Sequence, residues 1–274
     1  MHLAQDVTLF EVEQREFSAQ PFVTPYSIAM LRERTHGFLI ALILCCLMFA
    51  KSAGKASSCI PGERDALLAF KAGITDPGDK LRSWQGQDCC KWSGVSCSNN
   101  TLHVIKLDVS QYALKGELNS SLAALTRLVH LNMSYNDFGG MAIPEFVGSF
   151  KKLKHLDLSC ANFGGKVPPQ LANLSILEHL DLNSFNSSTI MIDSFVWISY
   201  LTSLRYLDLS WLDLAASSDW LQVTRDATGG KNLFRCLKQL RFLDVSINKL
   251  TGSISGWLED LSTFHRKKGI FSVH

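Results

Sequence analysis

The chain has 274 residues, of which 46% are apolar and 19% are charged, and its formal net charge is +2. A chain of this length and composition can bury a substantial core, and a charge so close to zero argues against a nucleic acid or a strongly acidic partner. Its eight cysteines are more informative, because two lie in an apolar run and four cluster shortly after it. This grouping indicates an oxidising compartment.

The first segments are typical of a targeting region. Residues 1–36 mix polar residues with proline and show no amphipathic period, so we expect a disordered leader. Residues 37–56 begin with a continuous apolar run that basic residues precede and small residues follow, which predicts a signal peptide cleaved near Gly54 or Ala56. An uncleaved signal-anchor is the alternative, although the run is short for a membrane span. The start, Met1 or Met30, stays open.

Residues 57–101 have the composition of a cap over the open end of a repeat array. Leu67 and Phe70 belong to a set of apolar residues at helical spacing, which predicts a short amphipathic helix. A turn-rich break and a tryptophan-containing segment follow it. Four cysteines allow three disulfide connectivities, and a zinc site is disfavoured because the segment holds no C-x-x-C pair. These cysteines are Cys59, Cys89, Cys90 and Cys97.

One short motif, with the pattern L-x-x-L-x-L, recurs six times in the rest of the chain. Its second leucine stands at positions 107, 131, 156, 180, 207 and 243, at intervals of 24, 25, 24, 27 and 36 residues. Such intervals are typical of leucine-rich repeats, in which each unit adds one parallel strand and stacked units share a core. The predicted strands lie within Val104–Ser110, Leu128–Ser134, Leu153–Ser159, Leu177–Asn183, Leu204–Ser210 and Leu240–Ser246.

The motif spacing also predicts the organisation of the second half. We expect leucine-rich repeats over residues 102–223, an irregular insertion over 224–239 that explains the longest interval, and a last repeat over 240–261. Residues 262–274 show no strand pattern and no closing cysteine cap, so we expect an irregular tail. Asn136 and Asn248 occupy the position at which a repeat asparagine bonds neighbouring backbones, but other residue types replace asparagine in the remaining units.

Three segments carry a family resemblance. Residues 59–97 resemble the amino-terminal cap of plant extracellular leucine-rich-repeat proteins, and LDLSCANFGGKVPPQLANL resembles their plant-specific repeat. The segment LRYLDLSWLDLAASSDWLQV resembles receptor-like proteins of the disease-resistance and fungal xylanase receptor type. The resemblance covers roughly residues 57–223. It implies disulfides Cys59–Cys89 and Cys90–Cys97, and the irregular end gives the chain the look of a truncated member.

Together, these observations predict an α/β repeat fold: a leucine-rich-repeat solenoid with a curved parallel sheet and a disulfide-bonded N-terminal helical cap. Equivalent outward positions on successive strands form columns, since parallel strands lie about 4.8 Å apart. The position before the second leucine holds Lys106, His130, His155, His179, Tyr206 and Phe242. The position after it holds Asp108, Asn132, Asp157, Asp181, Asp208 and Asp244. A third column is Gln111, Tyr135, Cys160, Ser184, Trp211 and Ile247.

The columns supply the candidate binding residues. Aromatic residues at exposed positions suit partner recognition, and we expect Tyr206, Trp211 and Phe242 to form one apolar patch, unless residues 224–236 fold over it. Three stacked histidines beside carboxylates could hold a metal or sense acidity, but solvated strand histidines are the commoner case, and we predict no metal site. The candidate ligand-binding residues on the concave face are Tyr135, His155, His179, Tyr206, Trp211 and Phe242.

Glycosylation is expected at N-x-S/T sequons, and a glycan at Asn132 would shield part of the concave face. The sequons lie at Asn99, Asn119, Asn132, Asn173 and Asn186.

Catalytic motifs are missing from the sequence, so we predict no enzyme and no cofactor. We expect a secreted or cell-surface recognition module that binds a protein, peptide or glycan. The resemblance implies a role in plant defence or cell-surface signalling, with a kinase-bearing co-receptor as partner. The alternatives are a secreted inhibitor of cell-wall-degrading enzymes, similar to polygalacturonase inhibitors, or a non-functional receptor fragment. The ligand itself is beyond the sequence.

Overall fold

The computed structural model describes residues 58–185, 190–214, 237–248 and 270–272. The chain separates into two compact units, residues 1–55 and 56–274, and every described residue lies in the second. The predicted leader, the signal peptide, Asn186 and most of the predicted insertion lie outside the described residues. Within the described ranges, no helix is both long and apolar enough to cross a membrane.

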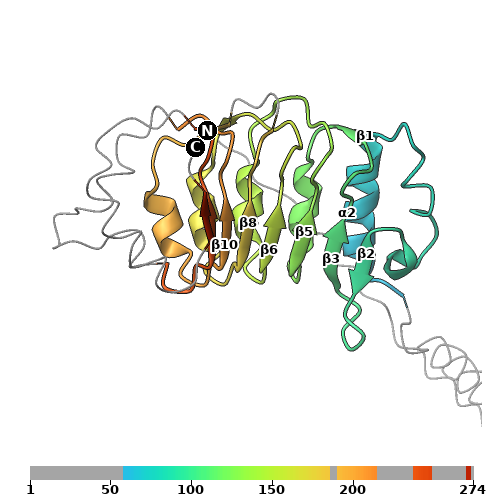
Figure 1. Ribbon diagram of the computed structural model, residues 1–274. Helices are drawn as coiled ribbons and strands as arrows, with labels where there is room; N and C mark the ends of the chain where they lie inside the picture. The colour runs from blue at the N-terminus through green and yellow to red at the C-terminus, as the bar shows by residue number, and fades with distance from the viewer. Residues whose placement is uncertain (1–57, 186–189, 215–236, 249–269, 273–274) are drawn as a thin grey trace, which may run out of the picture. The chain divides into compact units, whose positions relative to one another are not determined.

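The second unit is built on one long sheet, whose strands stand side by side in Figure 1. Among the described residues this sheet has eight strands in the order β12-β11-β10-β8-β6-β5-β3-β2, and all neighbours pair in parallel except β2 and β3. The strands are β2 (Val95–Cys97), β3 (Val104–Asp108), β5 (His130–Asn132), β6 (His155–Asp157), β8 (His179–Asp181), β10 (Tyr206–Asp208), β11 (Phe242–Asp244) and β12 (Ile270–Ser272).

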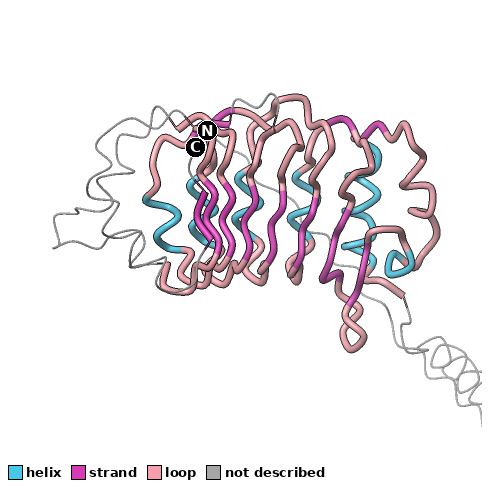
Figure 2. The backbone as a smooth tube through the Cα atoms, in the orientation of Figure 1, coloured by secondary structure: helices cyan, strands magenta, loops and turns pink. Residues whose placement is uncertain are grey.

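The predicted repeat motif forms these strands because its leucines need a shared core. The second leucine of each copy, from Leu107 to Leu243, is buried, and the residues on either side of it point away from the core. Among the described residues, β3, β5, β6 and β8 are each followed by a short 3-10 helix on the other side of the core, visible behind the sheet in Figure 2. These helices are η2 (Ser120–Ala124), η3 (Glu145–Ser149), η4 (Pro169–Asn173) and η5 (Val196–Tyr200).

Two further strand pairs flank this sheet. β1 (Ile74–Thr75) pairs with β4 (Lys115–Gly116) in the antiparallel sense, and β7 (Gly165–Lys166) pairs in parallel with β9 (Ile190–Met191). Gly116 has φ +136°, and a Cβ there would lie 2.5 Å from the carbonyl oxygen of Gly73. Only glycine permits this close approach of cap and first repeat.

Asparagine side chains join neighbouring repeats, as the sequence predicts. The Nδ2 of Asn136 donates to the carbonyls of Val109 and Met133 at 3.0 and 2.8 Å, and its Oδ1 accepts from the Leu114 backbone N–H at 2.9 Å. Asn248 bonds the backbone of the preceding repeat in the same way, at Leu212. Each amide thus satisfies buried backbone groups that the turn leaves unpaired.

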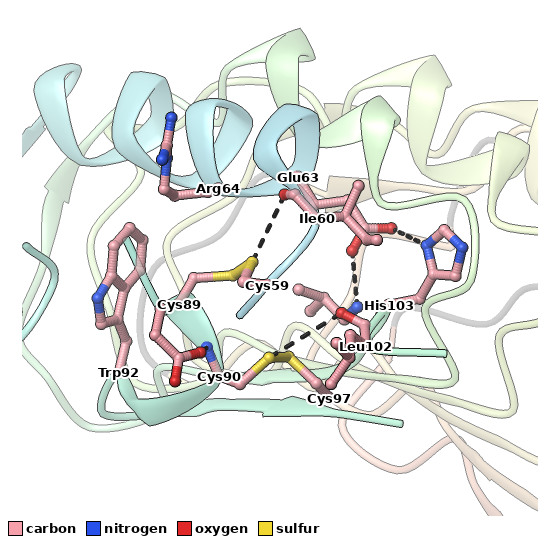
Figure 3. Close-up of a disulfide and its surroundings, with 12 residues drawn as sticks. Cys59, Ile60, Glu63, Arg64, Cys89, Cys90, Trp92, Cys97, Leu102 and His103 are labelled. Atoms are coloured by element: carbon pink, nitrogen blue, oxygen red, sulfur yellow. Dashed lines mark hydrogen bonds and ion pairs between the residues drawn. A yellow bond between two sulfur atoms is a disulfide. The ribbon is translucent and has the colours of Figure 1, made fainter. Parts of the chain in front are cut away.

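The cap covers the amino-terminal end of the core with helix α2 (Pro61–Ala72) and the short helix η1 (Cys89–Lys91). Glu63 on α2 is buried, and its carboxylate accepts a hydrogen bond from the Val104 backbone N–H at 2.7 Å. The other carboxylate oxygen lies 2.8 Å from Nδ1 of His103 (Figure 3). A buried carboxylate needs such partners, so Glu63 ties the cap to the first repeat strand.

The disulfides implied by the family resemblance are present. Cys59 bonds Cys89 and Cys90 bonds Cys97, with Cα–Cα distances of 5.2 and 5.4 Å (Figure 3). The four sulfurs lie within 4.8 Å of one another, a spacing that could suit a metal, but all four are used in disulfide bonds.

One prediction about strands is wrong: the sequence predicted an irregular tail over 262–274, but Ile270–Ser272 within it pair with β11 as β12. A further strand that the sequence did not predict lies inside the predicted cap, where Val95–Cys97 form β2 against β3. Both are three-residue strands at a sheet end, where pairing with an existing edge supplies the backbone hydrogen bonds that a short sequence pattern does not announce.

Candidate functional site

The candidate site is a row of five stacked rings that crosses the long sheet, which we call the ring ladder. Neighbouring ring centroids lie 4.1 Å apart from His130 to Tyr206 and 4.3 Å apart at the last step. The angles between neighbouring ring planes are only 4–15°. The members are His130, His155, His179, Tyr206 and Phe242, from β5, β6, β8, β10 and β11.

The strand register builds this ladder. The five residues are direct neighbours in successive parallel pairs, so each ring stands beside the same position of the next strand. Backbones of paired strands lie about 4.8 Å apart, whereas these rings are closer. The side chains therefore converge on this face, as expected on the concave side of a curved sheet.

Stacking decides which part of each ring a partner can reach. In a parallel stack each inner ring has both faces covered by its neighbours, so only its edge is free toward solvent. A neutral imidazole edge carries one N–H donor and one acceptor, and the tyrosine edge carries a hydroxyl. The ladder therefore offers a partly exposed row of hydrogen-bonding groups on an apolar base, which suits binding and offers no activated nucleophile.

The histidines of the ladder are neutral near neutral pH. Burial, followed by the charges of His155 and Lys106, lowers the pKa of His130 to about 4. Burial followed by repulsion from His155 likewise lowers the pKa of His179 to about 4, and burial lowers that of His155. Nε2 of His130 lies 3.8 Å from an Asp108 carboxylate oxygen, and because the imidazole is neutral at neutral pH this contact is not an ion pair there.

The acid row lies beside the ladder and consists of the carboxylates that follow the second leucine. In each repeat this side chain accepts from the backbone N–H two residues later, as Asp208 does from Ser210 at 2.9 Å. These bonds close the turn after each strand and give the column a structural role. The members of the acid row are Asp108, Asp157, Asp181, Asp208 and Asp244, and Asn132 replaces the acid on β5.

Two members of the acid row differ from ordinary carboxyls. Burial, followed by the charges of Asp208 and Asp157, raises the pKa of Asp181 to about 7. Burial also raises the pKa of Asp208, and the charge of Asp244 adds to this effect. The carboxyl of Asp181 therefore titrates near neutral pH, whereas the sequence offered the histidines as possible acidity sensors and favoured ordinary solvated strand histidines.

The third column lies at the turns after the strands and has a left-handed backbone. Tyr135, Trp211 and Ile247 have φ of 56°, 62° and 57°, and all three side chains are exposed. The Trp211 ring packs edge-on against Phe185, with centroids 5.0 Å apart. Phe185 is also exposed, and the repeat pattern does not mark it as a surface aromatic because it stands where a repeat asparagine is expected.

The predicted apolar patch divides between two places. Tyr206 and Phe242 stack in the ring ladder, whereas Trp211 packs against Phe185 at the turn. The described residues thus divide the candidate set among the ring ladder, the Trp211–Phe185 pair and Tyr135. His155 and His179 join the ladder, and Tyr135 stands in the turn column.

Comparisons with known proteins match the cap and the repeats as separate segments. Residues 60–98 match the leucine rich repeat N-terminal domain, and residues 152–174 and 239–261 match the Leucine Rich Repeat. A chain of the BIR3–SERK2 complex from Arabidopsis thaliana is 31% identical with a TM-score of 0.50, and the match covers 54% of this chain and 81% of that chain. The chain belongs to the plant leucine-rich-repeat family.

Its homologues in this family are receptor-like proteins. Receptor-like protein EIX1 of Solanum lycopersicum is 34% identical over 217 residues, which are 73% of this chain and 20% of the relative. Receptor-like protein 6 of Arabidopsis thaliana is 32% identical over 219 residues, 70% of this chain and 22% of the relative. The chain spans between 12% and 22% of the length of the first curated relatives that it matches.

The sequons of this leucine-rich-repeat chain differ in their surroundings. Asn99, Asn119 and Asn173 are exposed, and Asn173 ends helix η4 on the side away from the long sheet. Asn132 is half-buried, and its Oδ1 accepts from the Ser134 backbone N–H and hydroxyl at 2.9 and 2.8 Å. A sugar at Asn132 would stand beside the ring ladder, so its presence would restrict access to the candidate site.

Proposed function

We propose that this chain is a non-catalytic recognition module that binds a protein or peptide ligand across its ring ladder. The observation that carries the proposal is the ladder itself: five rings on five successive strands, partly exposed, on a sheet face. Large aromatic residues with polar edges contribute most of the binding free energy at many protein interfaces. The resulting surface is continuous along the sheet, which favours an extended ligand over a compact small molecule.

The family relationship supports an extracellular or cell-surface role in plant defence or signalling. Two disulfides in the cap suit an oxidising compartment, and the homologues are plant receptor-like proteins. A recognition module of this kind passes on a signal through a partner, and we propose a co-receptor that carries a kinase domain. SERK2, seen in a complex with BIR3, is the first protein to try in this role.

The test is selection of binders followed by substitution on two faces. A displayed library of extended peptides is selected on the purified protein, and the selected peptide is measured against a variant with His155→Ala and His179→Ala. We expect loss of about 2 kcal/mol of binding free energy or more, as for an interface hot spot. The matched control is Tyr200→Ala, an exposed aromatic residue on η5. Equal binding to the ladder variant and the control would contradict the proposal.

A further inference from the structure

An exposed tyrosine stands on the helical side of the core, away from the ring ladder. Tyr200, the last residue of η5, is 60% exposed, the highest value among the exposed large apolar side chains of the described residues. In the part of the chain that the structure describes, its ring stacks on no other ring and its hydroxyl forms no hydrogen bond. The packing of the protein itself therefore gives this ring no role.

A glycosylation sequon occupies the equivalent position of the preceding repeat. Asn173 is the last residue of η4, as Tyr200 is of η5, and 27 residues separate the two. The same interval separates His179 from Tyr206, which pair directly on β8 and β10, so the two repeats are in register from helix to strand. The two helices lie side by side (Figure 2). The Asn173 and Tyr200 positions are therefore neighbours on this side of the core.

Hydrogen bonds fix this register directly beside the sequon. The hydroxyl of Ser203 donates to the carbonyl of Ser175, the third sequon residue, at 3.1 Å. The backbone N–H of Arg205 donates to the carbonyl of Glu178 at 2.8 Å. Asn173 and Ser175 are themselves exposed, and within the described ranges no hydrogen bond engages the Asn173 side chain. The amide is therefore accessible, and the distance to the next repeat is held constant.

We propose that Asn173 carries an N-linked glycan whose first sugar packs against the ring of Tyr200. In the secretory pathway, Nδ2 of Asn173 forms a bond to the anomeric carbon of a polyprenyl-diphosphate-linked oligosaccharide. The bond from that carbon to the diphosphate breaks, and the amide gives up one proton. A sugar ring presents a face of C–H groups to the apolar face of tyrosine, while the hydroxyls of both stay in water. The glycan thus covers the ring that the protein leaves bare.

This inference goes beyond the proposed function, because it concerns the side of the core opposite to the ring ladder. The two repeats present His179 and Tyr206 on the long sheet and the sequon at the end of η4. A glycan held against Tyr200 is tied down on the helical side and leaves the ladder open to a partner. The contact also joins two neighbouring repeats, so it should add to the stability of the solenoid.

The experiment uses the full chain secreted from plant cells. Mass spectrometry of the peptide that contains Asn173 should show a glycan, and Ser175→Ala should abolish it while keeping the carbonyl that accepts from Ser203. Thermal unfolding is then compared for the unaltered chain, Ser175→Ala, Tyr200→Ala and the double variant. We expect Tyr200→Ala to lower the melting temperature by about 2–4 °C in the glycosylated chain and to leave it nearly unchanged in the Ser175→Ala background.

Two controls separate the contact from general effects of sugar and ring. Asn99→Gln removes another exposed sequon, between β2 and β3, and should leave the effect of Tyr200→Ala at full size. Tyr200→Phe keeps the ring and should keep the melting temperature of the glycosylated chain. An unmodified Asn173 would overturn the inference. An equal effect of Tyr200→Ala with and without the Ser175 hydroxyl would also overturn it, and so would no effect in either background.

Oxidative footprinting gives a second measurement that does not depend on stability. A sugar packed on the ring shields it from the oxidant, so Tyr200 should react more strongly in Ser175→Ala than in the unaltered chain. Equal reactivity in the two proteins would show that the ring is uncovered and would refute the contact. Neither measurement involves a peptide ligand, so failure here leaves the role of the ring ladder to its own test.

Discussion

Asp181 couples the stability of the sheet to pH. Its folded-state pKa of about 7 is above the ordinary value of 3.8 for this carboxyl, so the folded chain holds this proton more tightly than the unfolded chain. The stabilisation is present below the unfolded pKa and is lost as pH rises through about 7. Asp181→Asn should therefore raise the unfolding free energy above pH 7, by roughly 1–3 kcal/mol, and change it little near pH 4.

Denaturant unfolding of both proteins over this pH range measures the effect. The ladder histidines act in the opposite direction, because their lowered pKa values make the fold lose stability as pH falls from 6.5 toward about 4. That contribution is common to both proteins and cancels in the difference. A difference that does not change with pH would contradict the assignment.

Glu63 is expected to hold the cap to the first repeat. Glu63→Ala removes a buried carboxylate and leaves the Val104 backbone N–H without its acceptor, so we expect a loss of roughly 2–4 kcal/mol. The measurement is the urea midpoint, with exposed Glu145→Ala as the control at less than about 0.5 kcal/mol. Equal shifts in the two variants would show that the Glu63 bonds are unimportant.

At the residue scale, the sequence predicts where a side chain stands on the sheet better than it predicts the burial and pKa of that side chain. The alternation of the motif places His155 and His179 in one outward column, and the structure stacks them. It does not predict that burial raises the pKa of Asp181 to about 7, because burial of a carboxylate depends on how neighbouring repeats converge. The lowered histidine pKa values and the pairing of Trp211 with Phe185 escape sequence reasoning for the same reason.

At the scale of secondary-structure elements, the Cys59–Cys89 disulfide stabilises the cap. It spans a sequence separation of 30 residues, so restriction of the unfolded chain contributes roughly 3–4 kcal/mol. Cys59→Ser together with Cys89→Ser should lower the melting temperature accordingly. Cys160→Ser, which alters a cysteine that is free in the described structure, is the control. An unchanged melting temperature in the double variant would refute the contribution.

The sequence predicts the strands that carry the leucine motif, but it does not predict the strands at the two ends of the sheet. The six leucine motifs form consecutive parallel strands, and β10 pairs directly with β11 despite the interval of 36 residues between their leucines. β2 and β12 carry no motif, since each is a three-residue strand added to a sheet edge. Their existence follows from edge pairing, which sequence periodicity does not report.

At the scale of the whole molecule, we propose that the chain enters the secretory pathway and loses its leader. The small-residue pattern after the apolar run predicts a mature amino terminus between about residues 54 and 58, just before the first disulfide cysteine. Terminal sequencing of secreted protein measures this directly. Recovery of an intact Met1 or Met30 would favour a retained anchor.

The central claim is that the ring ladder is the surface that meets the partner. Oxidative footprinting of the complex with a library-selected peptide tests it, because tyrosine, phenylalanine and histidine all react and can be read residue by residue. The account predicts strong protection of Tyr206, Phe242 and His179, with Tyr200 on η5 reacting as in the free protein. Unchanged reactivity along the ladder, with protection confined to η5, would contradict it.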